Sequence, residues 1–186
     1  MEKTTKQSHK DIIKVVIYGP ESTGKTTLSS DLATYYSTNW VPEFAREYLQ
    51  KKWDNFGEKC SREDLLFIAQ QQINLENELI HTANKFLFCD TNILITRVWS
   101  EIYFEGFCDP KILNLINALH YDNYILTDID VPWEADDLRD MPNQREMLYQ
   151  YHKKILESYG LNYLRVSGTP DERIKKVVTY LNQMYR

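Results

Sequence analysis

Short apolar runs alternate with stretches of helical spacing along the chain. The apolar runs have the length and the β-branched and aromatic content of buried strands. They cover residues 12–18, 39–43, 85–91, 121–128 and 163–166. Apolar residues at helical spacing cover residues 26–36, 44–49, 61–82, 92–105 and 109–120, a stretch ending near 160, and the segment from 170 onward. This alternation predicts an α/β domain in which helices cover both faces of a five-stranded parallel sheet.

Two helix starts carry clear local signals. Ser61 with Asp64, and Thr169 with Glu172, match the capping-box pattern, in which each side chain bonds the other residue's backbone N–H. We interpret the many Gln, Asn and Glu residues of the 61–82 helix as its solvated face.

One segment between a strand and a helix has no core periodicity. Residues 129–145 are polar and contain prolines, which predicts a mobile lid that leads into the next helix. The polar residues 1–10 are expected to form a terminal tail. Since neither a repeat nor a linker interrupts the remainder, residues 11–186 are predicted to form a single domain.

The loop after the first strand carries the most specific motif. It reads G-x-x-x-x-G-K-T and precedes a helix. In such a loop the backbone N–H groups hold phosphates, Lys25 reaches the β- and γ-phosphates, and the Thr26 hydroxyl binds Mg²⁺. The alternative, a glycine-containing surface turn, does not explain the strand before the loop or the helix after it. The predicted nucleotide-binding residues are Gly19, Glu21, Ser22, Thr23, Gly24, Lys25, Thr26 and Thr27.

Composition excludes several partners. The net charge is −5 and the sequence has no basic run, so nucleic acid is not an expected partner. No apolar run approaches the roughly 20 residues that cross a bilayer, and the first ten residues lack the apolar core of a signal peptide. We therefore expect a cytoplasmic protein without membrane insertion.

A carboxylate follows each of two predicted strands. Glu43 ends the second and Asp90 the third, so both should lie at the edge of the sheet where nucleotides bind. We assign Asp90 to Mg²⁺ and Glu43 to the proton of an acceptor hydroxyl, although these roles could be exchanged. As alternatives, Glu43 is an acid at a helix start and Asp90 caps the following helix.

The predicted lid supplies positive charge. Arg139 and Arg145 are expected to close on the transferred γ-phosphoryl group. The alternative is that both are solvated surface charges.

Four segments together resemble the ribosylnicotinamide kinase domain of NadR proteins. They are GPESTGKTTL at 19–28, VPEFAREY at 41–48, CDTN at 89–92 and DVPWEADDLRD at 130–140. Their order and spacing run through almost the entire chain. The resemblance implies a three-layer P-loop NTPase fold of the nucleoside/nucleotide-kinase type. It also implies ATP with Mg²⁺ and phosphorylation of the nicotinamide riboside 5′-hydroxyl to give nicotinamide mononucleotide for NAD salvage.

The same resemblance extends to the adenine site and to domain content. In kinases of this architecture, residues equivalent to Gly168, Thr169 and Pro170 flank the adenine. NadR proteins often carry a nucleotidyltransferase domain with an H-x-G-H motif and a helix-turn-helix. No histidine of this sequence has such neighbours, so we expect a stand-alone kinase domain without adenylyl transfer or DNA binding.

The composition of the lid favours a cationic acceptor. Residues 130–140 contain one arginine, and their carboxylates number six when Asp128 is counted. A kinase for nucleoside monophosphates tends to need several arginines, whereas acids and aromatics suit a pyridinium ring. Which aromatic side chain stacks on the ring is left open. The predicted acceptor-binding residues are Glu43, Phe44, Arg46, Asp90, Trp99, Tyr103, Asp130 and Trp133.

Two other functions stay open from the sequence. One is a kinase for another nucleoside or nucleotide, and the other is a regulator that hydrolyses ATP slowly without passing on the phosphate. The carboxylates after both the second and the third strand favour the enzyme, because a nucleotide switch needs only the magnesium acid.

Overall fold

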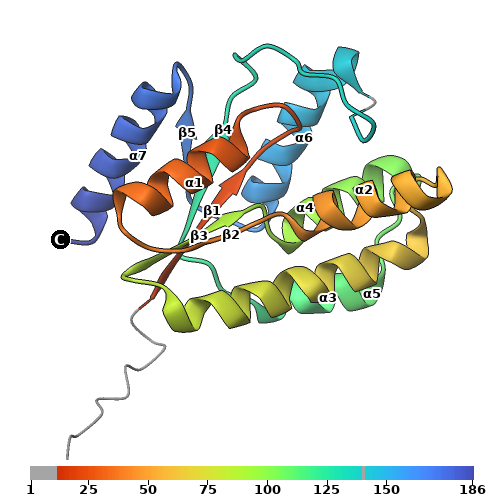
Figure 1. Cartoon of the computed structure of the whole chain (residues 1–186), viewed down its shortest axis with the longest axis horizontal. Helices are drawn as coiled ribbons and strands as arrows, with labels where there is room; N and C mark the ends of the chain where they lie inside the picture. The colour runs from red at the N-terminus through yellow and green to blue at the C-terminus, as the bar shows by residue number, and fades with distance from the viewer. Residues whose placement is uncertain (1–11, 140) are drawn as a thin grey trace, which may run out of the picture.

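The computed structural model describes residues 12–139 and 141–186, and the predicted tail lies outside them. A single parallel sheet has the strand order β2-β3-β1-β4-β5, which confirms the predicted architecture (Figure 1). The strands are β1 Ile13–Tyr18, β2 Trp40–Val41, β3 Phe86–Asp90, β4 Asn123–Thr127 and β5 Tyr163–Val166. The helices are α1 Lys25–Tyr35, α2 Phe44–Phe56, α3 Arg62–Leu79, α4 Ile93–Tyr103, α5 Pro110–Ala118, α6 Arg145–Ser158 and α7 Pro170–Met184. Short 3₁₀ turns lie at Ile80–Thr82 and Pro142–Gln144.

Helices cover both faces of this sheet (Figure 1). Alternate side chains of β1 point to opposite faces, so Val15 and Ile17 pack with α1 and α7. Val16 and Tyr18 pack with α3, α4, α5 and α6 on the other face. Because β1 lies at the centre of the sheet, the loop after it lies at the middle of the sheet edge.

Two element boundaries differ from expectation. The helix predicted over 44–49 continues to Phe56 and ends at Gly57, whose φ of 64° is left-handed. None of its residues is fully buried, so its second half shows no apolar stripe. The second strand is reduced to Trp40–Val41, because it pairs only with β3 at the edge of the sheet.

The capping signals are confirmed. Ser61 with Asp64 starts α3, and Thr169 with Glu172 starts α7, with both reciprocal hydrogen bonds present in each case.

Among the described residues no helix is long and apolar enough to cross a membrane.

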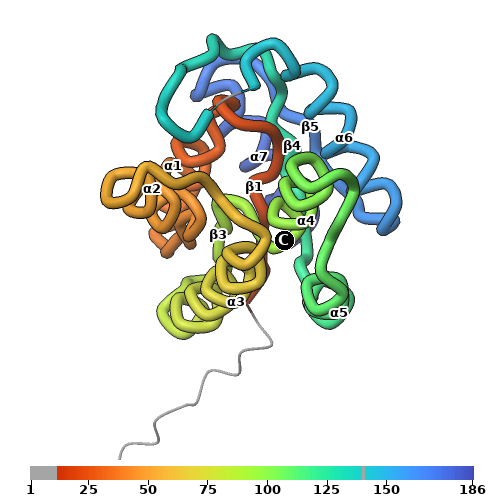
Figure 2. Tube along the Cα trace, turned by 90° about the vertical axis from the view of Figure 1, so that its right-hand side faces the viewer, coloured from red at the N-terminus to blue at the C-terminus, as the bar shows by residue number. Residues whose placement is uncertain are grey.

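The segment after β4 is irregular up to the turn at Pro142–Gln144. Figure 2 shows it arching over the same side of the molecule as α1 and α2 before the chain enters α6. We call residues 129–139 the lid segment from here on.

Candidate active site

The loop between β1 and α1 needs its glycines. Gly19 and Gly24 have φ values of 144° and 77°, which side chains rarely adopt. A Cβ on Gly19 would lie 2.6 Å from Thr127 Oγ1, so a larger residue would clash as well. Gly24 ends the loop at the start of α1, whose first turn contains no acidic residue. The N-terminal N–H groups of α1 and its dipole therefore favour an anion at this loop.

Two residues outside the loop, one on β4 and one on α7, contact it and stabilise its conformation. Thr127 on β4 lies 2.7 Å from the Thr23 hydroxyl. Arg173 on α7 is 3% exposed and donates to the carbonyls of Thr23 at 2.5 Å and Gly168 at 3.0 Å. Sequence reasoning missed both, and nothing distinguishes Arg173 from the other charged residues of α7 before the fold brings it to the loop.

The start of α1 faces the end of β3. Lys25 Nζ donates to the Pro20 carbonyl at 2.6 Å, and Thr26 Oγ1 donates to Asp90 Oδ2 at 2.5 Å. Burial raises the pKa of Asp90, although Lys25 and the bond from Thr26 act in the opposite direction. Asp90 does not cap the next helix, because the Asn92 side chain accepts from the N–H of Leu94 there.

The second carboxylate has a different environment. Glu43 lies directly before α2, at the helix start that its alternative reading expects, but its side chain makes no capping bond there. Burial raises its pKa to about 7, Lys25 lowers it, and the charge of Asp90 raises it further. Glu43 can therefore exchange a proton near neutral pH, which suits a group that accepts the proton of a hydroxyl.

Gln72, which was predicted to lie on a solvated helix face, holds the backbone on both sides of Glu43. Gln72 on α3 is 3% exposed; its Oε1 accepts from the N–H of Phe44 at 2.8 Å, and its Nε2 faces the Pro42 carbonyl at 3.4 Å. Glu76, one turn later, is 2% exposed. The interpretation of α3's polar residues as a solvated face was therefore wrong for these two, which face α2 and the sheet.

One cavity of about 1230 Å³ brings most predicted residues together. Its volume exceeds the usual range for a site holding one small ligand, so it has room for a donor and an acceptor. The predicted residues that line it are Glu21, Ser22, Thr23, Gly24, Lys25, Thr26, Thr27, Glu43, Phe44, Arg46, Asp90, Trp99, Tyr103, Arg139, Gly168 and Pro170.

The aromatic part of the wall comes from two helices. On α4, the ring centroids of Trp99 and Tyr103 are 5.5 Å apart. On α2, Phe44 stacks with Tyr48 at 5.8 Å. The cavity wall thus includes the aromatic side chains of Phe44, Trp99 and Tyr103 as well as the loop after β1.

Five predicted residues do not line the cavity: Gly19, Asp130, Trp133, Arg145 and Thr169. Arg145 donates to the carbonyls of Val131 at 2.8 Å and Ser22 at 3.1 Å, and its guanidinium lies 5.8 Å from the centroid of the Trp133 ring. The Asp130 carboxylate pairs with Arg173 and accepts from the N–H of Gly168 at 2.5 Å. In this structure these side chains hold the lid segment and the neighbouring loops.

The Thr26–Asp90 pair fits a hard divalent cation. A hydroxyl and a carboxylate are the oxygen ligands that Mg²⁺ uses beside a nucleotide. Asp90 Oδ1 is buried and has no hydrogen-bond partner among the described residues, so one carboxylate oxygen is available to a cation. The described residues hold no group of three or more His, Cys, Asp or Glu side chains suited to a metal.

Comparisons with known proteins identify the family of this chain. A family model described as an AAA domain, AAA_28, matches residues 14–173. The "Trifunctional NAD biosynthesis/regulator protein NadR" of Escherichia coli (strain K12) is 28% identical over 173 residues, which are 91% of this chain and 42% of that protein. The chain thus spans less than half the length of the curated relatives it matches.

Solved structures give the same picture. A NadR protein in complex with NAD and AMP-PNP superposes with a TM-score of 0.77 at 22% identity, covering 94% of this chain and 51% of that one. A deoxyadenosine kinase from M. mycoides superposes with a TM-score of 0.65 at 13% identity, covering 92% of this chain and all of that one. The chain therefore belongs to the AAA_28 family of AAA domains and has the P-loop kinase fold of the NadR proteins.

Proposed function

We propose that this domain transfers the γ-phosphoryl group of ATP to the 5′-hydroxyl of nicotinamide riboside, giving nicotinamide mononucleotide and ADP. The observation that carries the proposal is the position of Glu43, a carboxylate with a pKa near neutrality in the same cavity as the phosphate loop. A nucleotide switch has no use for such a group, whereas a kinase uses it on its acceptor hydroxyl.

The donor half of the reaction rests on the loop after β1. Its N–H groups and the α1 dipole bind the phosphates, and Lys25 exchanges its bond to the Pro20 carbonyl for the β- and γ-phosphates. Thr26 and Asp90 would hold Mg²⁺, which when bound neutralises charge on the phosphates. Arg139, in the cavity wall, adds positive charge beside the transferred group.

On the acceptor side, Glu43 binds the 5′-hydroxyl and takes its proton. The hydroxyl oxygen forms a bond to the γ-phosphorus while the bond to the ADP oxygen breaks, so the proton ends on Glu43 and the leaving charge on ADP. Phe44, Trp99 and Tyr103 offer faces for the pyridinium ring. Trp133 is a weaker candidate because its ring already lies against Arg145.

The comparisons support this acceptor. A NadR structure described as a complex with NR superposes with a TM-score of 0.77 at 22% identity. The curated relatives carry NAD biosynthesis in their names.

An acceptor panel tests the proposal. ADP release is measured with Mg²⁺-ATP alone and with nicotinamide riboside, adenosine, cytidine or a pyrimidine nucleoside monophosphate. We expect nicotinamide riboside to stimulate ADP release the most. Stimulation only by another acceptor would make the protein a different kinase, and slow release that no acceptor changes would favour the regulatory ATPase.

A further inference from the structure

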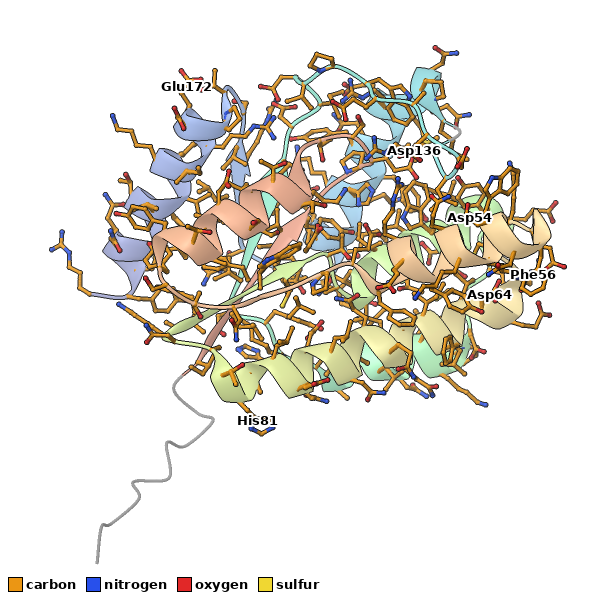
Figure 3. All side chains as sticks on the ribbon, in the orientation of Figure 1. Asp54, Phe56, Asp64, His81, Asp136 and Glu172 are labelled. Carbon is orange, nitrogen blue, oxygen red and sulfur yellow. The ribbon has the colours of Figure 1, made fainter. Side chains whose placement is uncertain are left out.

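A single lid carboxylate bonds two arginines of the cavity wall. Asp136 accepts from Arg46 Nη1 at 3.1 Å and Nη2 at 2.6 Å, and its Oδ2 lies 3.0 Å from Arg139 Nε. Arg46 belongs to α2, whereas Asp136 and Arg139 belong to the lid segment. Asp136 lies 90 residues after Arg46 in the sequence. Figure 3 shows Asp136 on the lid segment, above the helix that carries Asp54.

The turn that carries Asp136 holds its carboxylate in place. Asp136 Oδ1 also accepts from the N–H of Leu138 at 3.0 Å, and the Asp136 carbonyl accepts from the N–H of Arg139 at 3.2 Å. Burial would raise the pKa of Asp136, but the bonds from Arg46 and Leu138 and the charge of Arg139 bring it below its usual value. The Asp136 carboxylate thus lies between two guanidinium groups that would otherwise repel each other.

The other end of the same segment touches the phosphate loop. The N–H of Glu134 donates to Ser22 Oγ at 2.9 Å, and the Glu134 carbonyl accepts from Arg139 at 2.7 Å. Ser22 lies in the loop that binds the donor, whereas Arg46 lies on the helix that follows Glu43. Residues 134–139 therefore connect the loop after β1, where the phosphate donor would bind, to α2, beside which the acceptor would bind.

We propose that Asp136 is a positioning residue that couples donor binding at the phosphate loop to acceptor binding beside α2, by fixing Arg46 and Arg139 together in the cavity wall. This inference rests on the proposed kinase function. A nucleotide that orders the lid segment also orders Asp136, which in turn restricts Arg46. The acceptor then binds with a smaller loss of conformational entropy, because Arg46 is already held in place. Because coupling between two sites is reciprocal, the acceptor should strengthen nucleotide binding by the same factor.

Three variants separate this role from a structural one. Asp136→Asn keeps the shape but removes the charge, and Asp136→Glu keeps the charge. Asp137→Asn is the matched control for loss of charge. Asp137 is the adjacent, exposed lid carboxylate of the same cavity wall, but its bond to α2 comes from the neutral amide of Gln50, at 3.1 Å, and not from an arginine. Calorimetry measures the affinity for nicotinamide riboside with and without Mg²⁺-AMP-PNP.

We expect AMP-PNP to raise that affinity about 10-fold in the wild type and in Asp137→Asn. In Asp136→Asn the enhancement should fall to about 2-fold or less, with AMP-PNP alone bound nearly as before, and Asp136→Glu should restore part of it. The proposal is wrong if Asp136→Asn keeps the full enhancement, or if Asp137→Asn loses as much of it.

Failure of the proposed function would look different. In that case the wild type would bind AMP-PNP but not nicotinamide riboside. The connection made by residues 134–139, which we call the bridge, is then tested by measuring hydrogen exchange of amides 134–139 in the AMP-PNP complex. Faster exchange in Asp136→Asn than in the wild type and Asp137→Asn supports the bridge. Equal exchange in all three overturns it.

Discussion

Glu43 and Asp90 show how environment separates two similar carboxylates. Asp90 is bonded to the Thr26 hydroxyl, whereas Glu43 makes no capping bond and has a pKa of about 7 because it is buried. One is suited to a cation and the other to a proton. Their positions were predictable, because each follows a strand that ends at the same edge of the sheet.

Replacing Glu43 by Gln tests its role in proton transfer. We expect kcat to fall about 100-fold or more while the affinity for Mg²⁺-ATP changes little, because Gln keeps the shape but cannot take a proton. Steady-state kinetics and nucleotide titration check this. As a control, Asp54→Asn, at the exposed C-terminal end of α2, should retain wild-type kcat. Unchanged turnover in Glu43→Gln would contradict the assigned role.

Replacing Asp90 by Asn tests the cation site. The variant should need about 10-fold more Mg²⁺ for half-maximal activity, because a neutral amide replaces a charged ligand. Thr26→Ser keeps the hydroxyl and should shift the requirement much less. A Mg²⁺ titration at fixed ATP measures both, and an unchanged requirement in Asp90→Asn would contradict the assignment.

The contacts of other residues in the site have no local signal in the sequence. Gln72, Arg173 and Asp136 lie within a helix or an irregular segment, and each acts on an element distant in sequence. Their polar character fits an ordinary solvated surface equally well. Only the tertiary contacts distinguish them, and these depend on how the helices and the lid segment pack.

At the scale of elements, α3 combines packing with support of the site. Its buried polar side chains lie against α2 and the sheet, with Gln72 bonding the N–H of Phe44. Glu76 accepts from the hydroxyl of Tyr121 at 3.0 Å and lies 3.7 Å from Lys14 Nζ. Burial raises the pKa of Glu76 to about 7, while Lys14 and Tyr121 act to lower it.

This buried carboxylate predicts a pH-dependent stability. The folded state binds the Glu76 proton more tightly than the unfolded state, so its contribution is complete below about pH 4.5 and is lost as pH rises toward 7. The loss amounts to about 3 kcal/mol. Glu76→Gln removes this dependence. The free energy of unfolding of the variant, minus that of the wild type, should therefore be larger at pH 8 than at pH 5.

Urea unfolding at the two pH values measures the difference. Comparing the variant with the wild type cancels the contribution of other titrating groups, including the buried His152, whose pKa is lowered to about 3 by burial and by the charge of Lys25. A difference between wild type and Glu76→Gln that is the same at pH 5 and pH 8 would contradict the prediction.

At the scale of the whole molecule, strand order creates the site. With β3 beside β1 and β2 on the far side of β3, the carboxyl ends of three successive strands of the sheet lead to the phosphate loop, Asp90 and Glu43. The alternation of strands and helices, together with the motif after the first strand, was enough to predict that these residues meet at the carboxyl edge of a parallel sheet, but not the order of the strands. The sequence could not predict how the lid segment lies over it, because residues 129–139 have no periodicity that ties them to a neighbour.

The central claim concerns the phosphate acceptor. The most direct measurement incubates the protein with Mg²⁺-ATP and nicotinamide riboside and follows the products by mass spectrometry, with Glu43→Gln as the control. The account predicts nicotinamide mononucleotide and ADP in equal amounts from the wild type and almost none from the variant. Formation of ADP without nicotinamide mononucleotide would contradict it.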